Sequence, residues 1–238
     1  MPKRFKCHCI PCLFLPNESG SSKLLLYFHG NAEDIGCTLD FLDELRNQLK
    51  IHVLAVEYPG YGIYKGNSNE KTIITDAEHV INFILKFSKW KEENIIIFGR
   101  SIGSGPATYL AARYKIKCLI LMSPFTSIKD VVAEHVGLLK ILLAERFRNI
   151  DNMRLVKSPI FIIHGKKDKL VPFIHSFNLV KECKAPYKLV NPEEMTHNYF
   201  DFLTDFLIPL KDFLFKIEIV CIGNEPFLLP IESFYEPY

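Results

Sequence analysis

The feature that most constrains this chain is the pentapeptide Gly-Arg-Ser-Ile-Gly at 99–103. An apolar run at 95–98 leads into it and a helix-compatible run follows, which predicts a sharp strand-to-helix turn. Such a turn strains its central residue and is tolerated only where the residues two before and two after are very small, as Gly99 and Gly103 are. The turn lifts the Ser101 hydroxyl clear of the backbone, and the helix behind it offers N–H groups to a developing oxyanion. We therefore interpret Ser101 as a catalytic nucleophile rather than a residue of a structural turn.

Length and charge limit the classes of protein that this chain can represent. Its 238 residues suit a single domain spanning 1–238, and a net charge of +2 with interspersed signs argues against a nucleic-acid partner. The basic first residues are not followed by an apolar signal core, and no apolar run approaches the ~18 residues of a membrane span. Seven cysteines, an odd number, suit reduced thiols. We predict a cytoplasmic protein, with peripheral membrane contact as the open alternative.

The hydrophobic pattern predicts strands that alternate with helices. Most of the predicted strands are continuously apolar, which is typical of a parallel sheet covered on both faces, whereas 5–10 alternates like an edge strand. We expect strands at 5–10, 23–28, 52–58, 95–98, 117–122, 159–164 and 187–190, and helices at 36–49, 73–85, after 103, and from about 198 to 215.

The segment 123–158 is longer than a simple crossover needs. Its helical stretch is apolar on more than one face, which indicates that it covers an apolar surface. We interpret it as a small helical lid, whose substrate-binding residues would be Leu138, Leu139, Ile141 and Leu142; the alternative is an ordinary helix packed on the sheet. The segment from about 216 to 238 is expected to be a tail lying on the body.

A nucleophilic serine needs a base and a carboxylate that orients it, both at the carboxyl ends of strands. Asp168 follows the strand at 159–164, and His197 follows the strand at 187–190. This Ser…Asp…His order is that of the α/β-hydrolase fold. The competing acids are Asp76, Asp130 and Asp151, and the competing bases at strand ends or in the lid are His29, His135 and His164.

The oxyanion would be bound by two backbone N–H groups. The first is that of Ile102, directly after the nucleophile, and the second is that of Asn31, with Ala32 as the next choice, in the loop where Gly30 allows close approach.

Cys7, His8, Cys9 and Cys12 could bind a metal or carry lipid, but the spacing lacks a second ligand pair, and a cysteine in a strand usually acts as a small apolar residue. No metal or cofactor is predicted.

Five motifs in order, HGNAED, YPGYG, GRSIGSGPA, HGKKD and MTHN, resemble those of the α/β-hydrolase-domain serine hydrolases over about residues 23–215. Among these the chain is most similar to the protein depalmitoylases, whose nucleophile turn reads similarly. The resemblance implies a serine hydrolase acting on acyl esters or thioesters, including those of lipidated proteins. Those depalmitoylases carry a longer, cysteine-rich amino-terminal extension that anchors them to membranes, whereas this chain begins near its first strand.

The sequence therefore predicts a mostly parallel α/β-hydrolase fold with helices on both faces and a small helical lid. The leading hypothesis is a serine hydrolase that cleaves carboxylic esters or thioesters through an acyl-enzyme, in particular the palmitoyl thioesters of proteins. The alternatives are a small-lipid esterase or lipase, a serine peptidase-like hydrolase, and a binding module without catalysis. A complete Ser-Asp-His set argues against the last of these.

Overall fold

Strands and helices alternate along the chain in the computed structural model, which describes residues 9–88, 90–136 and 145–218. The strands are β1 (Cys12–Leu15), β2 (Leu24–Phe28), β3 (His52–Val56), β4 (Ile95–Arg100), β5 (Cys118–Met122), β6 (Ile160–Ile163) and β7 (Tyr187–Val190). The helices are α1 (Leu39–Leu49), α2 (Glu70–Phe87), α3 (Ser104–Ala111), α4 (Ile128–Val136), α5 (Asn149–Met153), α6 (Ile174–Glu182) and α7 (Ile208–Lys216). Short 3₁₀ turns occupy Glu92–Asn94 and Ser101–Gly103, and a π-helical segment, Phe202–Leu207, runs into α7.

The strands form one sheet in the order β1-β3-β2-β4-β5-β6-β7. Only β1 runs antiparallel, against β3, while the other neighbouring pairs are parallel. The central pair sets Phe28 at the end of β2 opposite Gly99 in β4. The loop after β2 and the turn after β4 therefore leave the sheet side by side, at the edge where open α/β sheets place their sites.

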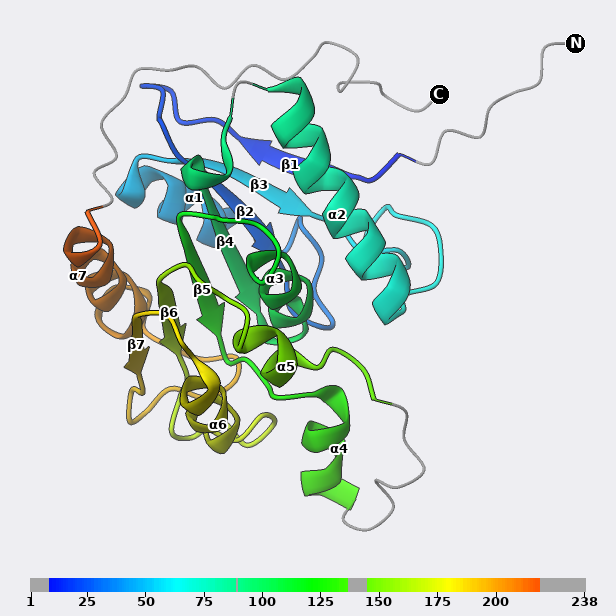
Figure 1. Ribbon diagram of the computed structural model, residues 1–238, viewed down its shortest axis with the longest axis vertical. Coiled ribbons are helices and arrows are strands. Elements are labelled where there is room, and N and C mark those ends of the chain that lie inside the picture. The colour runs from blue at the N-terminus through cyan, green and yellow to red at the C-terminus, as the bar shows by residue number, and fades with distance from the viewer. Residues whose placement is uncertain (1–8, 89, 137–144, 219–238) are drawn as a thin grey trace, which may run out of the picture.

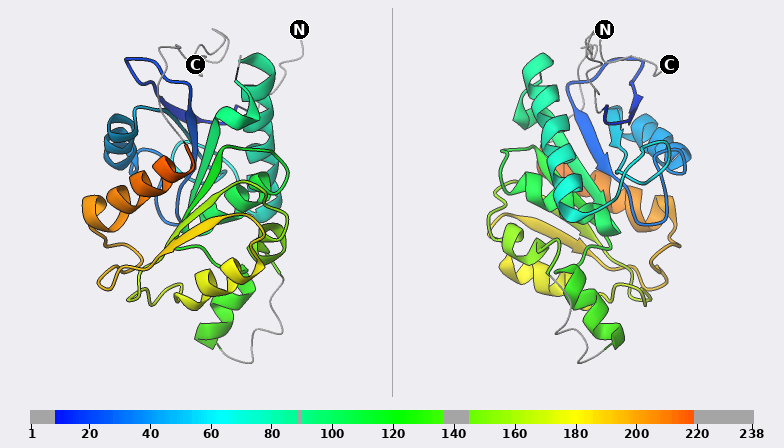
Figure 2. Two further views of the ribbon diagram at one scale, coloured as in Figure 1. Left: turned by 60° about the vertical axis from the view of Figure 1, so that its left-hand side comes forward. Right: turned by 90° about the vertical axis from the view of Figure 1, so that its right-hand side faces the viewer.

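Two apolar layers enclose the sheet. Along β2, Leu24, Leu26 and Phe28 pack on the face covered by α2, α3 and α6, whereas Leu25 and Tyr27 pack on the face covered by α1 and α7. Figure 1 and Figure 2 show this three-layer arrangement, with α1 and α7 on the side of the sheet opposite α2 and α3. Because both faces are covered, the central strands can be apolar throughout, and the predicted parallel α/β fold is confirmed.

The antiparallel edge strand lies further along the chain than predicted. The structure places β1 at Cys12–Leu15, and Cys9 and Ile10 belong to no strand. The first ladder pair joins Cys12 to Val56, and Glu57 N–H donates to Pro11 O just before it. Of the predicted strand at 5–10, Cys9 and Ile10 therefore belong to no strand, and residues 5–8, with Cys7 and His8, lie outside the described residues.

The helix α6, between β6 and β7, is absent from the sequence-based prediction. The terminal helical region begins at Phe202 rather than near 198, since the Asp201 side chain caps it by accepting from Thr204 N–H at 2.6 Å. The other predicted elements agree with the structure to within a few residues at their ends.

Only part of the predicted lid segment can be described. Helix α4 covers residues 128–136, and the four proposed substrate-binding residues Leu138, Leu139, Ile141 and Leu142 lie outside the described residues. Downstream, α5 belongs to the body of the domain: Met153 is buried in the core, and buried Asn149 donates to Phe125 O at 3.0 Å. A lid in this segment stays a prediction, and α4 is the described element that would carry it.

Candidate active site

The turn at 99–103 has the strained geometry that its sequence indicates. Ser101 has φ of 50°, a left-handed value that is costly for a residue with a side chain. A Cβ on Gly99 would lie 2.4 Å from Gly103 O, and a Cβ on Gly103 would lie 2.2 Å from Phe28 O. Both glycines are therefore required by close backbone packing, and Gly103 seats the nucleophile turn directly on the end of β2.

This close packing gives a testable effect on stability. We expect Gly103→Ala to lower the free energy of unfolding by roughly 1–3 kcal/mol, because the added methyl group must push the turn away from β2. Urea denaturation measures the change. The matched control is Gly36→Ala, where the nearest atom to the new methyl is a side-chain oxygen of Asp34 at 3.1 Å. Equal stability of the two variants would contradict the packing described above.

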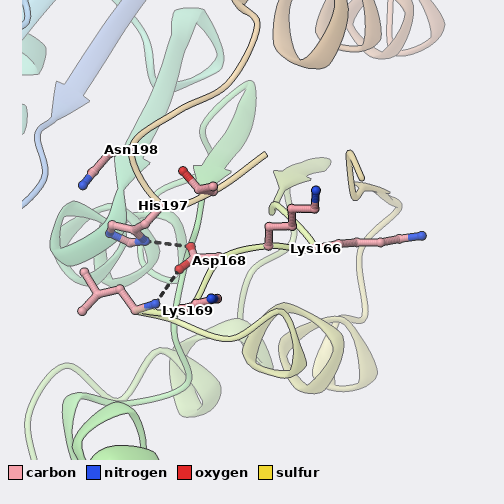
Figure 3. A pocket seen from close by; sticks show the side chains of 8 residues that line it. Lys166, Asp168, Lys169, His197 and Asn198 are labelled. Carbon is pink, nitrogen blue, oxygen red and sulfur yellow. Dashed lines mark hydrogen bonds and ion pairs between the residues drawn. The ribbon is translucent and has the colours of Figure 1, made fainter. Parts of the chain in front are cut away.

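Ser101, His197 and Asp168 form a hydrogen-bonded row. His197 Nε2 lies 3.0 Å from Ser101 Oγ, and His197 Nδ1 lies 2.7 Å from Asp168 Oδ2. Figure 3 shows the second of these contacts, with the imidazole edge turned toward the carboxylate. With the proton on Nδ1 directed to the carboxylate, Nε2 is free to accept the proton of the serine hydroxyl, which is the arrangement that activates a serine.

Asp168 is held from several sides. Its Oδ1 accepts from the backbone N–H groups of Leu170 at 3.0 Å and Val171 at 2.9 Å, and its Oδ2 lies 2.7 Å from His197 Nδ1 and 3.4 Å from His164 Nε2. Burial alone would raise the pKa of Asp168, but the hydrogen bonds from His164, His197 and Val171 N–H outweigh it and hold that pKa well below its usual range. The carboxylate is thus ionised at neutral pH. Its contribution to stability is complete above the ordinary aspartate pKa and is lost as pH falls through the lowered one.

The loops that carry the acid and the base are packed against each other. Lys167 N–H donates to Met195 O at 3.1 Å, and a Cβ on Gly165 would lie 2.0 Å from the same oxygen. Only glycine lets the loop after β6 approach the loop after β7 this closely. In the motif HGKKD, Gly165 therefore allows the close loop contact that brings Asp168 within reach of His197.

The competing acids and bases have other partners. Asp130 accepts from Thr126 Oγ1 at 2.6 Å, Asp76 from the Tyr64 hydroxyl at 3.1 Å, and Asp151 pairs with Arg148. His29 is fully buried, and its Nε2 lies 2.8 Å from Glu57 Oε1. His164 is also fully buried: its Nδ1 lies 2.7 Å from Ser176 Oγ, and its Nε2 lies 2.7 Å from Val171 O and 3.4 Å from Asp168 Oδ2, so it supports the carboxylate. The side chain of His135 lies outside the described residues.

The predicted oxyanion donors sit on the two segments that Gly103 brings together. Ile102 follows Ser101 in the 3₁₀ turn that leads into α3, and Asn31 lies in the loop after β2. The Asn31 side chain accepts from the Tyr61 hydroxyl at 2.5 Å. That these two N–H groups bind an oxyanion stays a prediction.

An open depression of about 700 Å³ lies beside the hydrogen-bonded row. Its lining combines Asp168 and His197 with a rim of lysines and one half-exposed apolar side chain: Lys166, Lys167, Asp168, Lys169, Leu170, Thr196, His197 and Asn198. Two of the lysines are neutralised, since Lys166 pairs with Glu193 and Lys167 with Glu194. Figure 3 shows Lys166 on the side of Asp168 that faces away from His197.

Arg100 and Glu33 are site residues that the sequence interpretation missed. Arg100 occupies the variable second position of the pentapeptide, and its guanidinium contacts Glu33 Oε2 at 2.5 Å, His197 O at 3.3 Å and Asn198 Oδ1 at 3.1 Å. In the sequence, only its position next to Ser101 indicates that Arg100 could belong to the site. Its partners lie 67 and 97 residues away along the chain, and no local motif links them to Arg100.

Within 9–88, 90–136 and 145–218, no three His, Cys, Asp or Glu side chains are grouped closely enough to hold a metal ion. The described helices also include none that is both long and apolar enough to span a bilayer.

Comparison with known proteins places the chain in a family. The family described as "Serine aminopeptidase, S33" matches residues 20–152, a stretch that includes Ser101 but ends before Asp168. The chain is 32% identical over 214 residues to the alpha/beta hydrolase domain-containing protein 17B of Homo sapiens, covering 90% of this chain and 74% of that protein. It is 31% identical over 206 residues to protein 17C of Xenopus tropicalis, covering 87% and 66%.

Among solved structures, Est1E from Butyrivibrio proteoclasticus, determined with bound ferulic acid, superposes with a TM-score of 0.72 at 21% identity, covering 87% of this chain and 94% of that one. The Pyrococcus furiosus esterase Pf2001 superposes with a TM-score of 0.72 at 18% identity, covering 87% of each chain. At these identities the likeness shows the fold. Together with the sequence relatives, it confirms the predicted resemblance: the chain belongs to the α/β-hydrolase family of serine hydrolases that includes the alpha/beta hydrolase domain-containing proteins 17.

Proposed function

We propose that this hydrolase cleaves carboxylic esters and thioesters through an acyl-enzyme on Ser101, with His197 as the general base and Asp168 as the residue that orients it. The observation that carries the proposal is the hydrogen-bonded row, with 3.0 Å from Ser101 Oγ to His197 Nε2 and 2.7 Å from His197 Nδ1 to Asp168 Oδ2. A binding module would gain nothing from a strained serine held at hydrogen-bond distance from a carboxylate-oriented histidine.

The reaction divides into two acyl transfers. Ser101 Oγ attacks the carbonyl carbon while His197 Nε2 takes the hydroxyl proton, and the oxyanion that forms is bound by the N–H groups of Ile102 and Asn31. Collapse of this intermediate breaks the bond to the leaving alcohol or thiol, which receives the proton from His197. Water then attacks the acyl-Ser101 ester with His197 again as base, which releases the carboxylic acid and restores the hydroxyl.

For the substrate class we propose acyl thioesters of lipidated proteins, palmitoyl thioesters in particular. Three observations support this: the similarity of the five motifs to the protein depalmitoylases, the apolar segment 137–143 predicted as part of a lid, and half-exposed Leu170 in the depression beside His197. The depression also contains Asp168 and a rim of lysines. Small-lipid esters are the second candidate.

The chain length of the acyl group provides the test. We expect kcat/KM to rise from acetyl toward octanoyl and longer esters and thioesters, because each methylene buried in an apolar pocket contributes about 0.8 kcal/mol until the pocket is full. Replacing the predicted lid residues Leu138 and Leu142 with serine should flatten this rise. A matched control is Leu155→Ser, a half-exposed leucine at the end of α5. The series is measured with p-nitrophenyl esters and with the corresponding thioesters.

The same assay separates the alternatives. A maximum at acetyl would contradict acyl-chain selectivity and leave a serine hydrolase with small ester substrates. Faster cleavage of an aminopeptidase substrate than of every acyl ester would favour the peptidase reading, to which the name of the matching family points. Cleavage of long-chain esters but not of a palmitoylated peptide thioester would favour a small-lipid esterase.

A further inference from the structure

A single guanidinium connects three segments of the active site. Arg100 ends β4 and precedes Ser101, so its backbone belongs to the nucleophile turn. Its Nη2 group donates to His197 O at 3.3 Å and to Asn198 Oδ1 at 3.1 Å, on the loop that carries the base. Its Nη1 group donates to Glu33 Oε2 at 2.5 Å, on the loop after β2. Asn198 lies next to His197 at the edge of the depression in Figure 3.

Glu33 passes this connection to the backbone of the predicted oxyanion loop. While Oε2 binds Arg100, Oε1 accepts from Gly30 N–H at 2.5 Å. A Cβ on Gly30 would lie 2.7 Å from Glu33 Oε1 and 3.7 Å from Arg100 Nη1. Glycine at position 30 is therefore what lets the carboxylate reach the backbone, and the carboxylate fixes the His29–Gly30 peptide, one residue before Asn31.

The Arg100–Glu33 pair differs from the lysine pairs on the rim. Each side chain of the pair is 17% exposed, whereas Lys166 and Lys167 are 43% and 55% exposed and their glutamates still more so. Exposed pairs of that kind contribute little, but a shielded arginine whose Nη1 and Nη2 groups hold two different loops imposes a geometry on both. A lysine has one donor centre and cannot contact Glu33 and His197 O in the same planar arrangement.

We propose that Arg100 and Glu33 are positioning residues, which hold the His197 loop and the Gly30–Asn31 loop in register with Ser101. The inference rests on the proposed serine-hydrolase function. Neither side chain touches the reacting atoms; each acts through backbone groups of the loops that carry the base and the oxyanion donor. The pair holds the two loops in place, just as Asp168 holds the His197 imidazole in its orientation.

Removing either member should lower turnover rather than substrate binding. We expect Arg100→Gln and Glu33→Gln each to lower kcat by about 10²-fold with little change in KM, since a shift of about 1 Å in a catalytic group can cost that much. Arg100→Lys should recover only a small part of the loss. The double variant should be little worse than either single variant, because residues acting as a unit are not additive. kcat is expressed per serine labelled by a fluorophosphonate.

The pH profile distinguishes positioning from a purely structural role. The charged groups around His197 are Asp168, Arg100 with Glu33 behind it, and the rim residues Lys166, Lys167, Lys169, Glu193 and Glu194. Arg100→Gln leaves Glu33 without its cation, which favours a protonated base and moves the acid limb of kcat/KM to higher pH. Glu33→Gln leaves the cation alone and moves that limb to lower pH. The double variant should return it close to the wild-type position.

The matched control is Arg154→Gln, which breaks an exposed Arg154–Glu182 pair of 2.8 Å between the end of α5 and α6 and should leave kcat and the acid limb unchanged. Three results would overturn the proposal: unchanged kcat per labelled serine, additive losses in the double variant, or acid limbs that move in the same direction. If Arg100→Gln does not fold, Glu33→Gln with its downward shift tests the same point. Failure of the proposed function itself looks different, because the wild-type protein would then show no turnover.

Discussion

Ser101→Ala is expected to abolish both fluorophosphonate labelling and p-nitrophenyl ester turnover. The probe reacts with a serine hydroxyl only where a base removes its proton, and in this structure Ser101 Oγ is the hydroxyl at 3.0 Å from His197 Nε2. Without the oxygen no acyl-enzyme forms, so the loss should reach the detection limit, at least ~10³-fold. Labelling is read on a gel and by mass spectrometry of the modified peptide, and turnover is measured by p-nitrophenol release.

Ser104→Ala is the matched control for this variant. Ser104 lies three residues further on, is also buried, and accepts from Asn149 Nδ2 at 2.9 Å. It should be labelled and should turn over ester at close to the wild-type rate. Folded wild-type protein that resists the probe, with circular dichroism and thermal unfolding intact, would instead identify a binding module.

Local motifs explain why the sequence singles out three residues whose side chains the structure places within hydrogen-bond distance of one another. The glycines of the pentapeptide encode the turn at Ser101, and the strand ends before Asp168 and His197 are marked by apolar runs that stop at glycine or proline. Each of these signals is contained in about ten residues. Parallel topology then brings the three strand ends to one edge of the sheet without any further information.

Helix α6 was missed because its burial does not follow its hydrophobicity. His175 and Ser176 are buried, whereas Ile174 and Phe177 are 46% and 43% exposed. Buried His175 bonds with Thr126 Oγ1 at 2.9 Å, and Ser176 Oγ lies 2.7 Å from His164 Nδ1, so polar groups face the core through specific partners. The amphipathic pattern of this helix is weak, because its inward face mixes the polar residues His175 and Ser176 with the apolar residues Leu179 and Val180.

The Arg100–Glu33 connection was hidden for a different reason. Its contacts join residues far apart in the chain. No sequence pattern in the loop after β2 indicates that the Glu33 carboxylate accepts from Gly30 N–H and contacts Arg100. The same limit applies to β1, where a plausible alternating run at 5–10 stood close to the actual strand at Cys12–Leu15. Sequence patterns specify elements, whereas these features depend on which elements meet.

Asp168→Asn is expected to lower kcat by roughly 10³–10⁴-fold with a smaller effect on KM. The two N–H groups of Leu170 and Val171 bind Oδ1, so the amide oxygen of an asparagine takes that position and its NH₂ group takes the position of Oδ2. That NH₂ group then faces His197 Nδ1, where the wild-type carboxylate lies at 2.7 Å. Nδ1 must become the acceptor, Nε2 carries the proton, and the imidazole can no longer take the proton of Ser101.

His197→Ala should cost a similar factor, because it removes the base that Asp168→Asn leaves in the wrong tautomer. The two effects should not add in a double variant, since both abolish one proton transfer. Stopped-flow and steady-state assays of p-nitrophenyl ester hydrolysis measure these losses, with kcat and KM separated.

Asp130→Asn is the matched control for the acid, because Asp130 bonds with Thr126 Oγ1 at 2.6 Å and is the next candidate by sequence position. Its turnover should stay within a few-fold of wild type. Near-normal activity of Asp168→Asn together with a large loss in Asp130→Asn would transfer the orienting role to α4. That exchange would require α4 to move Asp130 to His197 Nδ1, against a carboxylate already held there by two backbone N–H groups of its own loop. Because these hydrogen bonds hold Asp168 beside His197, a larger loss of turnover in Asp168→Asn than in Asp130→Asn is a strong test that Asp168 orients the base.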